Sequence, residues 1–87
     1  MRKEESHMKL VNLGNGNVVN ADDVSCVFDL NQMTDKQYIN RMRETGNLVR
    51  LCTSKMSRTA VLLRYGCVVV TSLTTETVRN RIAIAAD

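Results

Sequence analysis

The sequence predicts a small α+β domain, with a mostly antiparallel sheet and two helices. Two segments with helical periodicity stand among several short runs of apolar residues, and tight-turn residues separate those runs. The chain has 87 residues, which is enough for one domain. A chain of this length buries only roughly 60–65% of the surface that it exposes when unfolded, so we expect a partner subunit to help stabilise it.

The first half of the chain begins with a polar segment that has no periodicity. We expect residues 1–8 to be a flexible leader, with Met8 as a candidate native start behind an expression tag, and residues 9–87 to form the domain. The next segments read as three short strands with turns between them, because Gly14-Asn15-Gly16-Asn17 tolerates positive φ and Asp22-Asp23 is a typical turn former. The expected strands cover residues 9–13, 18–21 and 24–29.

A helix is expected after the third strand. Thr34 and Gln37 have the spacing of a capping box, and Gly46 suits the position that ends a helix. An apolar face is expected at helical spacing, formed by Tyr38, Ile39 and Met42.

The second half predicts three more strands and a final helix. The strands are expected over residues 48–52, 60–64 and 67–71, and Tyr65-Gly66 joins the last two as a tight hairpin. The final helix begins near Thr74, places Val78 and Ile82 on one face, and is expected to fray from Ala83 onward.

Catalytic and metal-binding residue types are scarce. The only histidine, His7, lies in the leader, so we expect no catalytic residues, no cofactor and no enzyme activity. Asp22-Asp23 could be imagined as a metal site, but adjacent acids at a turn are more often solvated, and we expect no metal.

The three cysteines are odd in number and lie in apolar surroundings, which indicates buried thiols in a reducing cytoplasm rather than disulfides; they are Cys26, Cys52 and Cys67. Cys52, before a basic loop, has an alternative reading as a reactive thiol.

Charge is distributed unevenly along the chain. Residues 36–87 contain nine Lys or Arg against three acids, and no acid lies between Glu44 and Glu76. That stretch contains four cations, Arg50, Lys55, Arg58 and Arg64. Such a single-sign stretch is a candidate contact for a polyanion, and the low aromatic content favours phosphate contacts on double-stranded DNA over base stacking. The alternative is a solvated face that only aids solubility.

No apolar run approaches the ~20 residues that cross a membrane, so no membrane contact is expected.

The ordered motifs resemble those of the RemA-like extracellular-matrix regulators over residues 10–82. The opening segment, Asn12-Leu13-Gly14-Asn15-Gly16-Asn17-Val18-Val19-Asn20-Ala21, resembles the opening signature of that family. Further matches in register are Gly46-Asn47-Leu48-Val49, Thr53, Ala60-Val61, Glu76-Thr77-Val78 and Arg81.

The resemblance implies a DNA-binding activator of biofilm-matrix genes, built as a ring-shaped homo-oligomer with a fold like that of LytTR DNA-binding domains. It also implies arginines at four positions where this chain differs, namely Asp23, Met56, Ser57 and Thr59. Lys55 and Arg58 lie close to those positions and could supply the charge with a shifted geometry.

Two hypotheses about function follow. In the first, the protein is a ring-forming regulator that binds duplex DNA, Lys55 and Arg58 contact phosphates, and Arg50 and Arg64 support them. In the second, it is an oligomeric scaffold or protein-interaction module of the same fold that has lost DNA binding. Asp23 and Met56 favour the second hypothesis. No small-molecule substrate is expected in either case.

Overall fold

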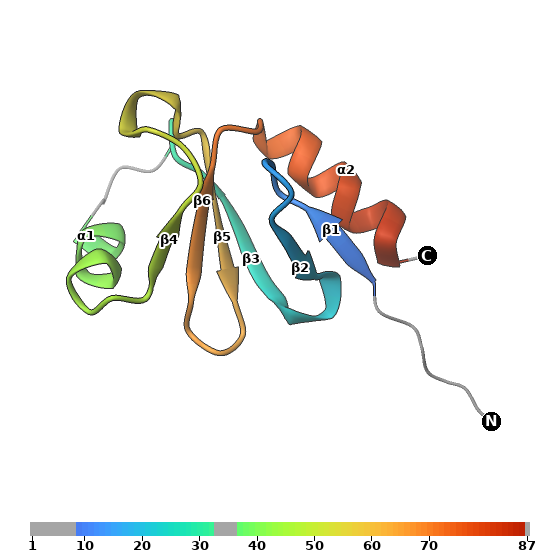
Figure 1. Ribbon diagram of the computed structural model, residues 1–87, viewed down its shortest axis with the longest axis horizontal. Coiled ribbons are helices and arrows are strands. Elements are labelled where there is room, and N and C mark those ends of the chain that lie inside the picture. Colours follow the sequence, from blue (N-terminus) through green and yellow to red (C-terminus); the bar gives the residue numbers. More distant parts are fainter. Residues whose placement is uncertain (1–8, 33–36, 87) are drawn as a thin grey trace.

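The computed structural model describes residues 9–32 and 37–86. Within those ranges the chain forms six strands, two α-helices and two short 3-10 helices (Figure 1), which confirms the α+β class. In chain order they are β1 Leu10–Asn12, β2 Val18–Asn20, η1 Ala21–Asp23, β3 Val24–Asp29, α1 Gln37–Glu44, β4 Leu48–Arg50, η2 Ser54–Met56, β5 Thr59–Leu63, β6 Val68–Thr71 and α2 Thr75–Ala86. The expected leader, residues 1–8, and the expected capping residue Thr34 lie outside the described residues.

The strands form two sheets rather than one. β1 and β2 make an antiparallel hairpin, and the other four strands form a sheet in the order β3-β5-β6-β4. β5 pairs antiparallel with both β3 and β6, whereas the edge strand β4 runs parallel to β6. The sheet is therefore mixed but mostly antiparallel.

Each face of the four-stranded sheet has its own hydrophobic core. Val61, Leu63 and Val69 pack with the β1–β2 hairpin and with Val78 of α2 in the first core. Their neighbours along β5 and β6 point the other way, because successive side chains of a strand alternate between faces. These neighbours form the second core with Ile39 of α1 and with Leu30; they are Ala60, Val68 and Val70.

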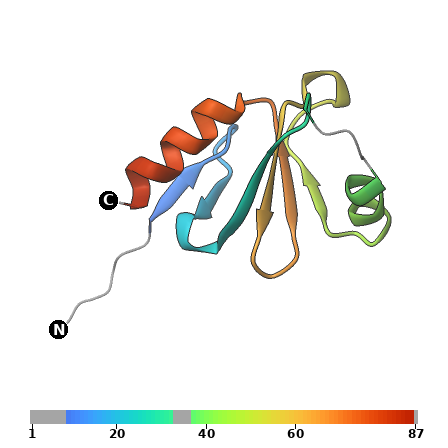
Figure 2. The ribbon, with the colours of Figure 1, turned by 180° about the vertical axis from the view of Figure 1, so that it is seen from behind.

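The two helices lie at opposite ends of the molecule (Figure 2). α2 contacts β1, β3 and η1, whereas α1 contacts β4. The expected apolar face of α1 is confirmed, with Ile39 buried and with Tyr38 and Met42 packed beside it. The expected end of α1 is confirmed too: Gly46 has a φ of +78°, its N–H donates to the Arg43 carbonyl, and the Asn47 N–H donates to the Met42 carbonyl.

The β1–β2 hairpin is tied to the sheet by one buried hydroxyl. The Thr71 hydroxyl donates to the Leu13 carbonyl across 2.6 Å, and Thr71 and Leu13 are 1% and 0% exposed. The hairpin turn is as expected, with positive φ at Gly14, Asn15 and Gly16. This attachment fixes the hairpin over one face of the sheet.

Two expectations about local structure are wrong. Cys26 is exposed: it pairs with Leu62 on the sheet face of the second core, but it is not packed into that core. A bulge between Val24 and Cys26 also inserts one extra residue into β3. The bulge interrupts the period-2 alternation, so Val24 and Val27 both pack on the first core. α2 does not fray at Ala83: it continues to Ala86, where Ile82 and Ala85 pack against the first core and hold its last turns.

This exposure changes the reactivity expected of the thiols. Cys26 is exposed, whereas Cys52 and Cys67 are half-buried. We expect a maleimide reagent to label Cys26 at a rate close to that of the denatured chain, and the other two several times more slowly. Mass spectrometry of the tryptic peptides over time measures the three rates. Equal protection of all three cysteines would contradict the exposed position of Cys26.

Candidate nucleic-acid interface

The connection between β4 and β5 carries two exposed cations on an anchored loop. Lys55 lies in η2, and Arg58 directly precedes β5. The Arg58 N–H donates to the Thr71 carbonyl at 3.0 Å, and the Arg58 carbonyl accepts from the Leu30 N–H at 2.9 Å. The backbone beneath the arginine is thus fixed on both sides. Neither cation forms an ion pair with any described acid.

Arg50 reaches this loop from the end of β4. Its Nη1 donates to the Ser57 hydroxyl at 2.8 Å, and that hydroxyl donates onward to the Thr53 carbonyl at 3.0 Å. Three of the four expected site cations therefore lie on or against the β4–β5 connection, namely Arg50, Lys55 and Arg58. Cys52 lies beside the same hydroxyl, with its Sγ 3.6 Å from the Ser57 Oγ.

Arg64 lies apart from these three cations. Thr59 pairs with Thr71 at the open end of the β5–β6 hairpin, next to the β4–β5 loop, whereas Arg64 lies in the turn that joins β5 to β6 at the opposite end of the sheet. Its Nε is 2.9 Å from the Asp23 Oδ1. Its charge is paired, and it does not join the loop cations.

The fold also brings an acid to the loop end of the sheet. Asp29 pairs with Thr59 across β3 and β5, although the two residues are thirty positions apart in the sequence. Its Oδ1 accepts from the Asn31 N–H at 2.9 Å, and it forms no ion pair with the described cations. Sequence reasoning missed Asp29 here, because only the strand order places it beside the loop.

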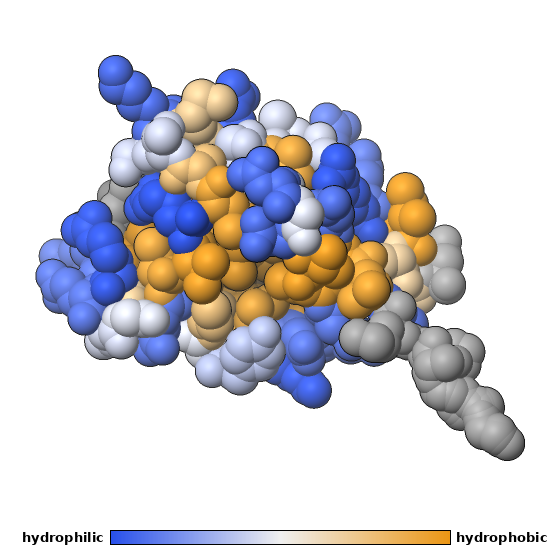
Figure 3. All heavy atoms as spheres, viewed as in Figure 1, coloured by the Kyte–Doolittle hydropathy of each residue, from blue (hydrophilic) through white to orange (hydrophobic). Residues whose placement is uncertain are grey.

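Apolar side chains gather in a groove on the sheet face that carries the hairpin. The hairpin and α2 leave the β4 side of this face open, and Figure 3 shows apolar side chains over β4 and over β2. The groove has a volume of about 210 Å³. Three of its lining residues are large and exposed, namely Val18 (47%), Val49 (45%) and Tyr65 (66%).

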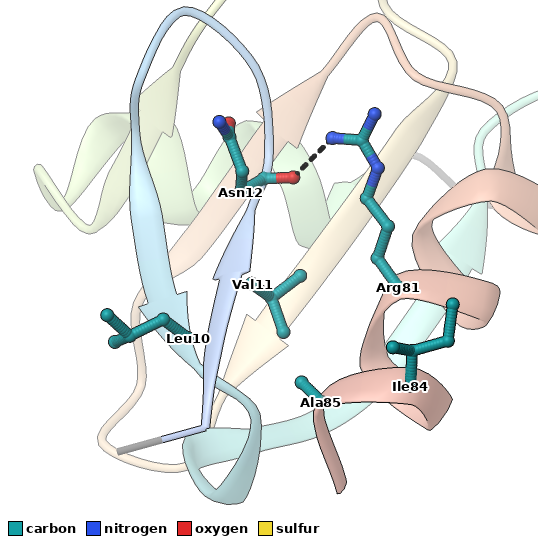
Figure 4. Close-up of a pocket in the computed structure, with 6 residues that line it drawn as sticks. All are labelled: Leu10, Val11, Asn12, Arg81, Ile84 and Ala85. Atoms are coloured by element: carbon teal, nitrogen blue, oxygen red, sulfur yellow. Dashed lines mark hydrogen bonds between the residues drawn. The ribbon is translucent and has the colours of Figure 1, made fainter. Parts of the chain in front are cut away.

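A second apolar cleft lies between β1 and α2 (Figure 4). It has a volume of about 410 Å³, and its lining includes Leu10 of β1 and Ile84 of α2. Arg81 closes one end, where its Nη1 donates to the Asn12 carbonyl at 2.7 Å. Ile84 is 74% exposed and Leu10 54%, so these lining residues of the cleft are as exposed as those of the groove.

Metal-binding and membrane-spanning features are absent from the part of the chain that the structure describes. No three His, Cys, Asp or Glu residues there lie together in a way that could hold a metal ion. None of the described helices has the length and apolar character needed to span a bilayer.

Comparison with known families gives one match that covers most of the chain. The model described as "RemA-like: Extracellular matrix regulatory protein A-like" matches residues 10–82. The chain belongs to the RemA-like family. This confirms the resemblance seen in the opening Asn-Leu-Gly-Asn-Gly-Asn segment.

Several relatives of this RemA-like chain carry the name "Putative regulatory protein". One from Cyanothece sp. is 30% identical over 80 residues, which is 92% of this chain and 88% of the relative. One from Geobacillus kaustophilus is 31% identical over 75 residues, or 86% of each chain. One from Lachnoclostridium phytofermentans is 30% identical over 74 residues, or 85% of this chain and 81% of the relative. Regulation is thus the role that their names share.

The positions where this RemA-like chain differs from the expected arginine pattern have distinct surroundings. Thr59 is not in the loop: it is the first residue of β5, it is 0% exposed, and its hydroxyl donates to the Leu73 carbonyl at 2.7 Å. The Ser57 hydroxyl accepts a hydrogen bond from the Arg50 guanidinium, so a cation from β4 lies beside a position where the resemblance led us to expect an arginine. Asp23 pairs with Arg64. Met56 is simply exposed.

Proposed function

We propose that this RemA-like protein is a cytoplasmic regulator of transcription that binds duplex DNA as a homo-oligomeric ring. The observation that carries the proposal is the pair of exposed cations, Lys55 and Arg58, on an anchored loop where neither has a described acid partner. Cations of this kind bind phosphate regardless of base sequence. The family description suggests extracellular-matrix genes as targets.

A mobility-shift assay on genomic fragments tests the proposal. Binding at about 50 mM salt that weakens steeply toward about 200 mM is expected, because phosphate contacts release counterions from DNA. Absence of binding even at the lower salt concentration would remove the DNA-binding function.

Repetition around a ring would make the small number of cations per subunit sufficient. Linked weak sites can raise avidity by roughly 10²–10⁴ when their geometry lets them engage together. The exposed groove and the cleft between β1 and α2 have no lining residue in common. Two different apolar surfaces suit a head-to-tail contact between copies, which closes into a ring when the rotation permits.

Self-association gives a prediction of its own. We expect Val49→Lys, a charge placed in the groove, to reduce the mass measured by light scattering at micromolar concentration from a multiple of 9.8 kDa toward 9.8 kDa. The matched control is Met56→Lys, which adds the same charge at an exposed residue of η2 outside the groove and should leave the mass unchanged. A parent protein that is already monomeric would contradict the ring.

The alternative function is an oligomeric scaffold or protein-interaction module that does not bind DNA. The observation that favours it is the Asp23–Arg64 ion pair, which neutralises a cation and places an acid where the family pattern has an arginine. Light scattering and mobility shift together separate the two functions, because the scaffold assembles without binding DNA.

We also propose that the protein is not an enzyme and acts without a cofactor, a small-molecule substrate or a membrane. The sole histidine of the chain, His7, lies before the RemA-like segment. General acid–base chemistry near neutral pH most often uses histidine.

A further inference from the structure

A polar pocket lies between α1 and the loop that carries η2. α1 lies beside the edge strand β4, and the η2 loop lies beyond the end of that strand (Figure 2). The pocket has a volume of about 220 Å³. Leu30 and Ile39, each 8% exposed, form an apolar floor. The other described lining residues are polar, namely Asn31, Asn40, Arg50, Ser54 and Ser57.

The pocket lining is rich in unused hydrogen-bond donors. Arg50 uses one N–H on Ser57, which leaves four of its five donors. The Asn40 Oδ1 accepts from the Arg43 Nη2 at 3.1 Å. The Asn40 amide nitrogen donates to none of the described residues, so both of its N–H donors remain for a ligand. The side chains of Ser54 and Asn31 form no hydrogen bond with the described residues. These groups together can donate to one ligand.

The charge of the lining is positive. Arg50 is the only charged group among the described lining residues, and none of them is acidic. Asp29, the acid that pairing with β5 brings to this end of the sheet, lies outside the described lining, where its carboxylate accepts a hydrogen bond from the Asn31 N–H. An anion would therefore meet a guanidinium without a competing carboxylate from the described lining.

The guanidinium is also held in place before any ligand arrives. The Ser57 hydroxyl accepts from Arg50 at 2.8 Å and is itself fixed by the Thr53 carbonyl at 3.0 Å. A planar guanidinium with its orientation fixed matches two oxygens of a phosphate or similar oxyanion. Fixing its orientation in advance lowers the entropy cost of binding.

We propose that this pocket binds a phosphate-class oxyanion, with Arg50 as its charged contact and with Ser54, Asn31 and Asn40 as neutral donors. The oxyanion has two possible sources, a free phosphate or phosphoester in solution, or a backbone phosphate of bound DNA. Only the second source rests on the proposed function. In either case, the bound anion would lie against the residue that holds Arg50 to the DNA-facing loop, Ser57.

The test is a titration of the full-length protein with inorganic phosphate at constant ionic strength, followed by nuclear magnetic resonance. We expect saturable shifts of the Asn31 and Asn40 side-chain amides and of the Arg50 Nε–H. Arg50→Gln keeps a polar side chain but removes the charge, and it should weaken phosphate binding at least tenfold. The matched control, Arg41→Gln, removes the same charge from an exposed site on α1 outside the lining and should bind phosphate like the parent.

A second titration with a short DNA duplex distinguishes the two sources. Saturation by phosphate in a variant that lacks Lys55 and Arg58 and no longer binds DNA would establish a site for a free oxyanion. Shifts with DNA but not with phosphate would assign the pocket to the DNA backbone. The proposal is overturned if neither ligand gives saturable shifts, or if Arg50→Gln binds as the parent does. If the protein fails to bind DNA at all, the phosphate titration still decides the proposal.

Discussion

Replacing Lys55 and Arg58 together with alanine should weaken binding to every DNA duplex and make the remaining binding less sensitive to salt. Each phosphate contact contributes about 0.9 to the slope of log affinity against log salt, so losing two contacts lowers the slope by about 1.8 for each engaged subunit. Mobility shift or fluorescence anisotropy at four salt concentrations measures this slope. The mass of the oligomer should stay unchanged, since neither residue lines the apolar groove.

The control for this double variant removes the same charge from the other end of the sheet. Lys9 and Arg64 are paired with Asp22 and Asp23, at N–O distances of 3.8 and 2.9 Å. Replacing both with alanine should leave most of the affinity and nearly the whole slope. If both double variants bind DNA more weakly than the parent and to the same extent, net charge rather than the loop governs binding. If the loop variant binds like the parent, the loop is only a solvated turn.

Leu13→Ala should be the most damaging single truncation of an apolar side chain in the hairpin. Leu13 is 0% exposed in the first core, and a buried Leu→Ala change costs about 2–5 kcal/mol. A natural domain of 87 residues has a total stability of about 4–13 kcal/mol, so this loss removes a large share of it. Urea unfolding followed by circular dichroism, at one fixed protein concentration, measures the change.

Leu10→Ala supplies the comparison for Leu13. The two leucines lie in the same hairpin, but Leu10 is 54% exposed in the single subunit, so when both truncations are made in the monomeric Val49→Lys variant, that of Leu10 should cost about 0.5 kcal/mol or less. Equal losses for the two variants would mean that the hairpin does not pack on the sheet as described.

The sequence predicted which helices and strands form better than it predicted which of them lie next to one another. Turn residues such as Gly14 and Gly46 have a local cause, the need for positive φ, and both were placed correctly. The bulge in β3 has no comparable local signal, because Ser25 resembles any outward strand residue. Strand order is equally hidden, so the parallel pairing of β4 with β6 and the division into two sheets could not be predicted.

The candidate site was predictable only to the extent that it is local in sequence. Lys55 and Arg58 are close neighbours in the chain, and the structure keeps them together. The pairings that distinguish Arg50 from Arg64 are tertiary. Arg50 bonds a serine seven positions ahead, across the loop that follows β4, and Arg64 meets Asp23, forty-one positions away. Charge counting along the chain detects neither partner, so it gave Arg50 and Arg64 the same supporting role.

The alternation of β5 and β6 between two cores bears on how firmly the chain is held in register. A strand buried on one face can slip by one residue and lose one set of contacts. Here a one-residue slip of β5 would turn Val61 and Leu63 toward α1 and turn Ala60 toward the hairpin, so that both cores would receive side chains of the wrong size at once. The β5–β6 hairpin therefore sets the alignment of the elements that pack on both faces of the sheet. It also fixes the position of the start of β5, which Arg58 directly precedes.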